Sequence, residues 1–173
     1  MKTASNRDPV LMFEQACAFL ECAEFTESEK SRIKYRTKSH GYVDIALSAF
    51  ACELFIKCLI IYLKGDYSRI HNLFDLWSKY KSLDNVRADK VERELKQWFN
   101  SSNPDMFTDM IKDASNAFEE WRYVFDHDSS DNIMVNPNFL RGFRIALRNL
   151  CCEYIFKESW SDYLNNKNVK DDI

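Results

Sequence analysis

The sequence contains only three glycines and three prolines among its 173 residues. Sheet-rich folds use both residue types at their turns, so this scarcity favours a few long helices joined by short connections. The sequence has no glycine-rich phosphate loop, no H-E-x-x-H zinc motif and no G-x-S-x-G nucleophile motif. We therefore expect neither a cofactor nor a metal ion.

The six cysteines form neither a metal-binding pattern nor a disulfide framework. There is no C-x-x-C pair, and no cysteine–histidine cluster has the spacing of a zinc site. The first residues, MKTASNRDPVLMFEQ, lack the apolar segment of a secretory signal. We therefore expect reduced thiols in the core of a cytoplasmic protein.

Charge of one sign is not in large excess, since the formal net charge is −3. This value argues against a general nucleic-acid coat protein, because such binding needs many cations against phosphates. The most basic stretch, 27–40, carries Lys30, Arg32, Lys34, Arg36 and Lys38. It is either a phosphate-contacting edge or a solvated connector.

Hydrophobic residues make up 46% of the chain, which suits one domain spanning residues 1–173. We expect a helical core over about 9–157 and a loose tail over 161–173. Apolar residues recur at helical spacing in six segments, namely 9–26, 41–63, 73–80, 86–99, 104–125 and 137–155. The pattern predicts an all-α bundle. Three helices should begin at a capping residue followed by proline, namely Asp8-Pro9, Asn103-Pro104 and Asn136-Pro137, and Gly65 should end the second helix.

The segment 41–63 is apolar enough to suggest a membrane span. It nevertheless contains Asp44, Glu53 and Lys57, each of which is costly in lipid. Together with Ser48, these residues predict a narrow polar stripe along one side of a helix. Glu53 and Lys57 are four residues apart and should form an ion pair. We therefore expect the central helix of a bundle and no membrane association.

Three segments resemble the HEPN family in their order and spacing, and a fourth then provides the closing helix. ALSAFACELFIKCLI is similar to the family's E-x-x-x-K helix, and IHNLFDLW resembles its H-x-L-x-x-L stretch. AFEEWRYVFDH resembles the W-R-Y segment of one branch, and NFLRGFRIALRNL resembles the closing helix. The resemblance implies an up-and-down helical bundle of four to five long helices plus short helices. It also implies a homodimer with the active motifs face to face.

Many HEPN proteins are metal-independent ribonucleases with an R-x(4–6)-H motif, and Arg122 with His127 matches this spacing. Tyr123 departs from the family, in which Asn, Asp or His is commoner after the arginine. Histidine suits removal of the 2′-hydroxyl proton, and arginine suits stabilisation of phosphate charge. Residues five apart on a helix point about 140° away from each other. A shared site therefore needs a helix end near residue 127 or a second protomer.

The resemblance thus implies a dimeric endoribonuclease of a toxin or phage-defence system, with an inhibitory protein partner. The alternative is a non-catalytic HEPN module that binds a protein or nucleotide and uses Arg122 structurally. A purely structural subunit is a third reading.

His71 is interpreted as a capping or packing residue, and His40 shows no pattern. Candidates for RNA contact are Tyr123, Arg141, Arg144 and Arg148, although the three arginines also suit a solvent-facing side of the last long helix.

Overall fold

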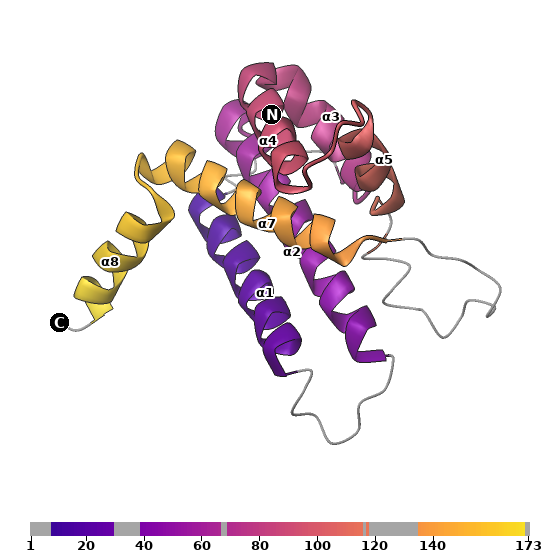
Figure 1. The fold of residues 1–173 in the computed structure, drawn as a ribbon. Helices are drawn as coiled ribbons and strands as arrows, with labels where there is room; N and C mark the ends of the chain where they lie inside the picture. The colour runs from indigo at the N-terminus through magenta and orange to yellow at the C-terminus, as the bar shows by residue number, and fades with distance from the viewer. Residues whose placement is uncertain (1–7, 30–38, 67–68, 116, 118–134, 172–173) are drawn as a thin grey trace.

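The computed structural model describes residues 8–29, 39–66, 69–115, 117 and 135–171 (Figure 1). Seven α-helices and one π-helical turn, η2, account for the regular structure in these ranges. They are α1 (Pro9–Glu29), α2 (Ser39–Lys64), α3 (Leu73–Leu83), α4 (Asn85–Trp98), α5 (Met106–Asp113), α7 (Pro137–Cys151), η2 (Cys152–Phe156) and α8 (Trp160–Asp171). These described ranges contain no strand, so the predicted all-α class is confirmed.

Helices α1 and α2 lie side by side and run in opposite directions, and α7 crosses α2 obliquely (Figure 1). Helices α3, α4 and α5 gather at one end of this pair, whereas α8 extends away from the body of the molecule. This arrangement puts α2 at the centre, in contact with α1, α3 and α7.

The apolar run of α2 forms the middle of the core. Every residue from Ala51 to Ile61 is buried, so neighbouring helices cover the whole circumference of α2 here. The stretch Val43–Lys64 is long and apolar enough to cross a membrane, but 78% of its most apolar window is buried inside the molecule. Such burial is what the core helix of a soluble protein shows.

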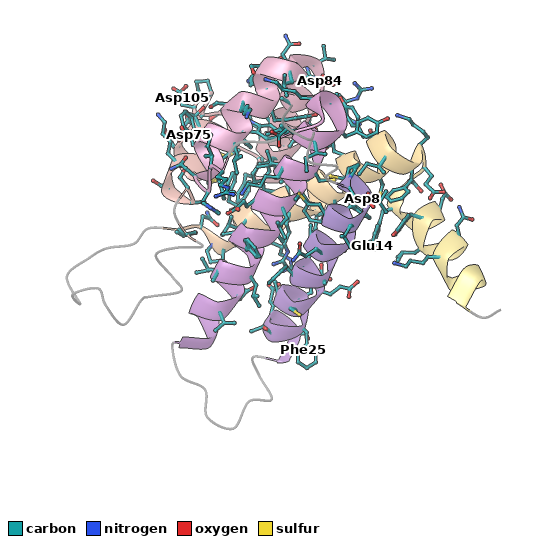
Figure 2. The ribbon with its side chains drawn as sticks, turned by 180° about the vertical axis from the view of Figure 1, so that it is seen from behind. Asp8, Glu14, Phe25, Asp75, Asp84 and Asp105 are labelled. Atoms are coloured by element: carbon teal, nitrogen blue, oxygen red, sulfur yellow. The ribbon has the colours of Figure 1, made fainter. Side chains whose placement is uncertain are left out.

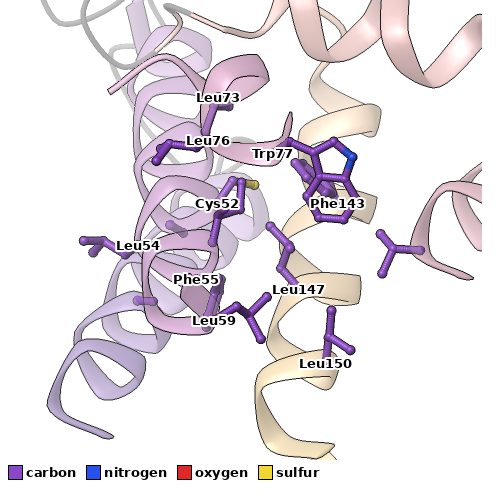
Figure 3. Close-up of a cluster of buried hydrophobic side chains, with 14 of the residues drawn as sticks. Cys52, Leu54, Phe55, Leu59, Leu73, Leu76, Trp77, Phe143, Leu147 and Leu150 are labelled. Atoms are coloured by element: carbon purple, nitrogen blue, oxygen red, sulfur yellow. The ribbon is translucent and has the colours of Figure 1, made fainter. Parts of the chain in front are cut away.

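Side chains from α2, α3 and α7 interlock in one hydrophobic cluster (Figure 3). Phe143 of α7 is fully buried, and its ring centroid lies 5.2 Å from that of Trp77 and 5.5 Å from that of Phe107. The edge-to-face geometry of both pairs is favourable for aromatic rings. The helical periodicity predicted for the last long helix is confirmed over α7, where the stripe residues Phe139, Leu140, Phe143, Leu147, Leu150 and Cys151 are buried. The last two stripe residues, Tyr154 and Ile155, lie in the π-helical turn η2, and Tyr154 is buried whereas Ile155 is partly buried.

Two of the three predicted helix starts are confirmed. The Asp8 carboxylate accepts a hydrogen bond from the Val10 backbone N–H at 2.8 Å, and Asn136 caps α7 in the same way. Gly65 ends α2 with a positive φ of 80°, as predicted for a residue that follows a helix.

Figure 2 labels Asp8, Asp75, Asp84 and Asp105, which lie at or near the first turns of four helices, where negative charge is favourable.

The predicted helix start at Asn103 and Pro104 is wrong by two residues. The Asn103 side chain accepts a hydrogen bond from the Asp105 backbone N–H at 3.0 Å, which forms a turn before the helix. Helix α5 begins at Met106 and already ends at Asp113, whereas the sequence predicts one helix through residue 125. The second half of that predicted helix, beyond Ala117, lies outside the described residues.

The predicted loose tail is also wrong, because α8 is helical from Trp160 to Asp171. Its aromatic side chains pack on the bundle. The Tyr163 ring lies 4.6 Å from Phe156 and 5.5 Å from Phe13, and Trp160 lies 6.4 Å from Phe13, measured between ring centroids. Residues 160 and 163 are three apart and share one helix face. Both rings can therefore pack on the bundle, and this packing holds α8 in place although most of its residues are polar.

Trp98 belongs to the segment 86–99, whose apolar residues recur at helical spacing, but its side chain is 54% exposed. Its indole ring lies directly over Gly142 of α7. A Cβ atom added at Gly142 would fall within that ring and would come 2.9 Å from Leu95 Cδ2. The glycine therefore permits the close approach of α4 to α7.

We expect Gly142→Ala to lower the free energy of unfolding by about 1–3 kcal/mol, because the new methyl group displaces the Trp98 ring. In a Trp98→Ala background the same change should be close to neutral, because the gain of about 1 kcal/mol from alanine as the better helix former is offset by the remaining close contact with Leu95 Cδ2. Urea denaturation of the four proteins gives both values. An equal effect of Gly142→Ala in the two backgrounds would contradict the close contact.

Candidate functional site

The predicted catalytic residues Arg122 and His127, together with Tyr123, lie outside the described residues. The described chain before them comprises residues 69–115 and residue 117. The Leu73 backbone N–H donates to the Ser115 carbonyl at 3.1 Å, and the Phe74 N–H donates to Ser115 Oγ at 3.2 Å. These bonds hold the end of the α5 segment against the first turn of α3.

The polar residues of α2 form two separate pairs, so the predicted single stripe is wrong. Nine residues separate Asp44 from Glu53, and at about 100° per residue they point to opposite sides of the helix. Asp44 and Ser48 point toward Arg144 of α7. Glu53 and its neighbour Lys57 instead face the segment before α3.

Glu53, Lys57 and His71 form a compact charged group that we call the Glu53 cluster. Lys57 Nζ lies 2.7 Å from Glu53 Oε1, which confirms the predicted ion pair. His71 Nδ1 lies 3.0 Å from the same oxygen. The side chains of Glu53 and Lys57 are 2% and 5% exposed, whereas that of His71 is 50% exposed. Glu53 Oε2 is buried and has no hydrogen-bond partner.

His71 does not cap α3, in contrast to one of its two interpretations from the sequence. Asn72 is the cap, because its side chain accepts a hydrogen bond from the Asp75 backbone N–H at 3.0 Å. His71 therefore remains available to bind Glu53. The sequence contains no signal for this contact, since the two residues are 18 positions apart and meet only through the turn between α2 and α3.

The Glu53 cluster has the arrangement of an oriented acid–base group. A carboxylate that accepts a hydrogen bond from one imidazole nitrogen fixes which tautomer the ring adopts. Nδ1 of His71 then carries a proton, and the half-exposed ring leaves Nε2 to exchange protons with solvent or a ligand. Glu53 and Lys57 come from the E-x-x-x-K segment and His71 from the H-x-L segment, so two of the segments that carry the family resemblance meet here.

The prediction of a solvent-facing arginine is wrong for Arg144, whose side chain is 1% exposed. Its guanidinium donates through Nη1 to Ser48 Oγ and lies 3.6 Å from Asp44 Oδ1. On the other side, Nη2 lies 3.6 Å from Glu27 Oε2. Arg144 thus joins α1, α2 and α7 inside the molecule and does not present its charge to a surface groove. Arg141 binds the same Glu27 at 2.9 Å, but its side chain is 48% exposed.

Arg148 is partly buried at the contact with α8. Its guanidinium lies 4.3 Å from the centroid of the Trp160 ring and donates to Asn149 Oδ1 at 3.0 Å. Burial lowers the pKa of the Arg148 guanidinium, an effect that the nearby Glu24 carboxylate opposes. The three candidate arginines therefore do not form one continuous basic surface, and of the three only Arg141 is exposed.

The cysteines match the prediction of reduced core thiols, since five are buried and only Cys22 is exposed. Burial raises the pKa of Cys17 and Cys152 to about 12, so both thiols are protonated at neutral pH. A protonated thiol is a poor nucleophile and metal ligand. In the described part of the chain, no three His, Cys, Asp or Glu side chains come together as a metal site.

A surface pocket of about 330 Å³ lies between α4 and α5, and none of its lining residues belongs to the Glu53 cluster. Its acidic residues Asp89 and Glu92 both bind Lys81, at 2.9 and 2.8 Å. Both carboxylates are thus already paired with a lysine, and no histidine lines the pocket, so its described lining offers no acid–base pair.

No protein-family model, curated protein or solved structure matches this chain.

Proposed function

We propose that the chain is a HEPN-type, up-and-down helical domain that acts as a metal-independent endoribonuclease, with Arg122 and His127 as the active pair. The observation that supports this best is the Glu53 cluster, in which two separate segments of the family resemblance come into contact. A third segment, with the R-x4-H motif, follows Ser115, which is hydrogen-bonded to the start of α3. Two segments chosen from the sequence alone thus meet in the fold.

In this proposal, His127 takes the proton of an RNA 2′-hydroxyl, and Arg122 holds the charge that develops on the phosphate. A homodimer pools two such motifs in one cleft. Tyr123 and the exposed Arg141 contact the RNA backbone, whereas Arg144 and Arg148 support the bundle. The protein works in the cytoplasm as a toxin or phage-defence component, and a partner protein restrains it.

Labelled single-stranded RNA incubated with the protein in EDTA tests the proposal. We expect the wild type to cleave, and Arg122→Ala and His127→Ala each to lower the rate by about 10²-fold or more, as loss of an acid–base or charge-stabilising group does. His40→Ala is the matched histidine control and should cleave like the wild type. Absence of wild-type cleavage, or normal cleavage by both variants, rules out this active site.

Thermal unfolding of the same proteins distinguishes the non-catalytic alternative. If Arg122→Ala unfolds the domain while His127→Ala affects no assay, the arginine is structural. The molecular mass in solution tests the dimer separately, because a strict monomer cannot form a cleft between two protomers.

A further inference from the structure

We propose that the outer face of α1 binds a basic, amphipathic helix of a partner protein. This binding is independent of RNA cleavage. Its basis is a line of exposed side chains along α1, which we call the α1 stripe and which comprises Leu11, Ala18, Cys22 and Phe25. Leu11 is 65% exposed and Phe25 is 68% exposed, so neither side chain belongs to the core.

The α1 stripe lies on one side of its helix. Leu11, Ala18 and Phe25 are seven residues apart, and Cys22 follows Ala18 by four. At about 100° per residue, the four positions fall within about 60° of one another. The residues that anchor α1 in the core lie on the opposite side of the helix, namely Phe13, Ala16, Leu20 and Ala23. The stripe therefore faces solvent along its whole length.

The shape of the α1 stripe fits another helix. From Leu11 to Phe25 it is about 21 Å long, at a rise of 1.5 Å per residue. Apolar positions at seven-residue spacing form the seam between two packed helices. Phe25 projects from the last turns of α1 away from the bundle (Figure 2). A helix of about 15 residues can cover the stripe and bury both large side chains.

The charge of α1 determines which helix fits. The α1 sequence contains five glutamates and neither lysine nor arginine. Glu14 and Glu21 are exposed and lie beside the stripe, next to the line of Phe25. Glu21 has no ion-pair partner in the described part of the chain, and Glu14 has an exposed one, Lys167, at 3.4 Å. A partner helix with lysine or arginine beside its apolar residues can pair with both carboxylates.

A second copy of this chain fits the α1 stripe less well. Two α1 helices packed on each other would bring no cation to Glu14 or Glu21, because α1 carries only acidic charges. The negative charges of both helices would then repel each other across the contact. Gln15, at the other edge of the stripe, has no charge to offset them. The acidic face therefore favours a basic partner over self-association.

A set of synthetic helical peptides tests this binding. The peptides carry leucine, isoleucine or phenylalanine at heptad spacing, with lysines beside these residues. A reordered control of the same composition spreads the apolar residues around the helix, and a second control has glutamate in place of lysine. Fluorescence anisotropy measures the dissociation constants with the purified protein. Alkylation of Cys22 reports the place of binding, since it is the one exposed cysteine of the six.

We expect at least one ordered lysine peptide to bind about tenfold or more tightly than both of its controls. Leu11→Ala and Phe25→Ala should each weaken this binding by about 10–100-fold, as loss of an anchoring side chain does. Val86→Ala is the matched control and should bind like the wild type, because Val86 is 72% exposed but belongs to α4. All three side chains are exposed, so the variants should fold, which circular dichroism checks.

The double variant Glu14→Gln/Glu21→Gln tests the role of charge. It should weaken binding by about 3–10-fold and make binding less sensitive to salt, because exposed ion pairs are weak and screened. Bound peptide should also slow alkylation of the Cys22 thiol, which lies within the stripe.

Several results would overturn the proposal. If no ordered peptide binds more tightly than its reordered control, the attraction is charge alone and the stripe is not a docking surface. Wild-type affinity in Phe25→Ala, or unchanged alkylation of Cys22, would show that the peptide binds elsewhere. If sedimentation shows a wild-type dimer that Phe25→Ala dissociates, the occupant is a second copy of this chain.

Discussion

Replacing Arg144 by alanine is expected to lower the free energy of unfolding by about 3–5 kcal/mol, the usual cost of breaking a buried ion pair by removing one partner. The guanidinium is 1% exposed and interacts with three helices, through Glu27 of α1, Asp44 and Ser48 of α2, and its own position on α7. Its removal takes a cation away from carboxylates that are themselves shielded from water, with side-chain exposures of 30% and 8% for Glu27 and Asp44.

Arg141→Ala is the matched control for this prediction. Arg141 lies on the same helix and binds the same Glu27, but its side chain is 48% exposed. Exposed ion pairs contribute little, so we expect a loss of about 0–1 kcal/mol. Chemical denaturation of both variants measures the difference. Similar losses for Arg141→Ala and Arg144→Ala would show that burial of the guanidinium does not determine the stability of this region.

The sequence predicts the helices well because their signals are local. The Asp8-Pro9 and Asn136-Pro137 starts, the Gly65 end and the apolar stripe of α7 each depend on residues within a few positions of one another. The α8 helix was missed for the same reason. Its polar residues lack a strong periodic pattern, and the contacts that hold Trp160 and Tyr163 come from distant parts of the chain.

The environment of Arg144 cannot be read from such local signals. Helical spacing puts Arg141, Arg144 and Arg148 on neighbouring positions of one helix face. Which of them is buried depends on how α7 is rotated against α1 and α2, and on the acids that these helices supply. Two of the Arg144 nitrogens, Nε and Nη2, lack hydrogen-bond partners, so the surrounding residues do not fully satisfy this guanidinium. The contact between Glu53 and His71 likewise depends on a turn between helices.

Glu53→Leu is expected to destabilise the protein by about 3–5 kcal/mol, because it takes the carboxylate away from the Lys57 ammonium in the core. The double variant Glu53→Leu/Lys57→Met should recover most of this loss, since apolar residues of similar volume often replace a buried ion pair without destabilisation. Urea denaturation of the two single variants and the double variant gives the coupling free energy. A double variant that is no more stable than Glu53→Leu would contradict a simple ion pair at this position.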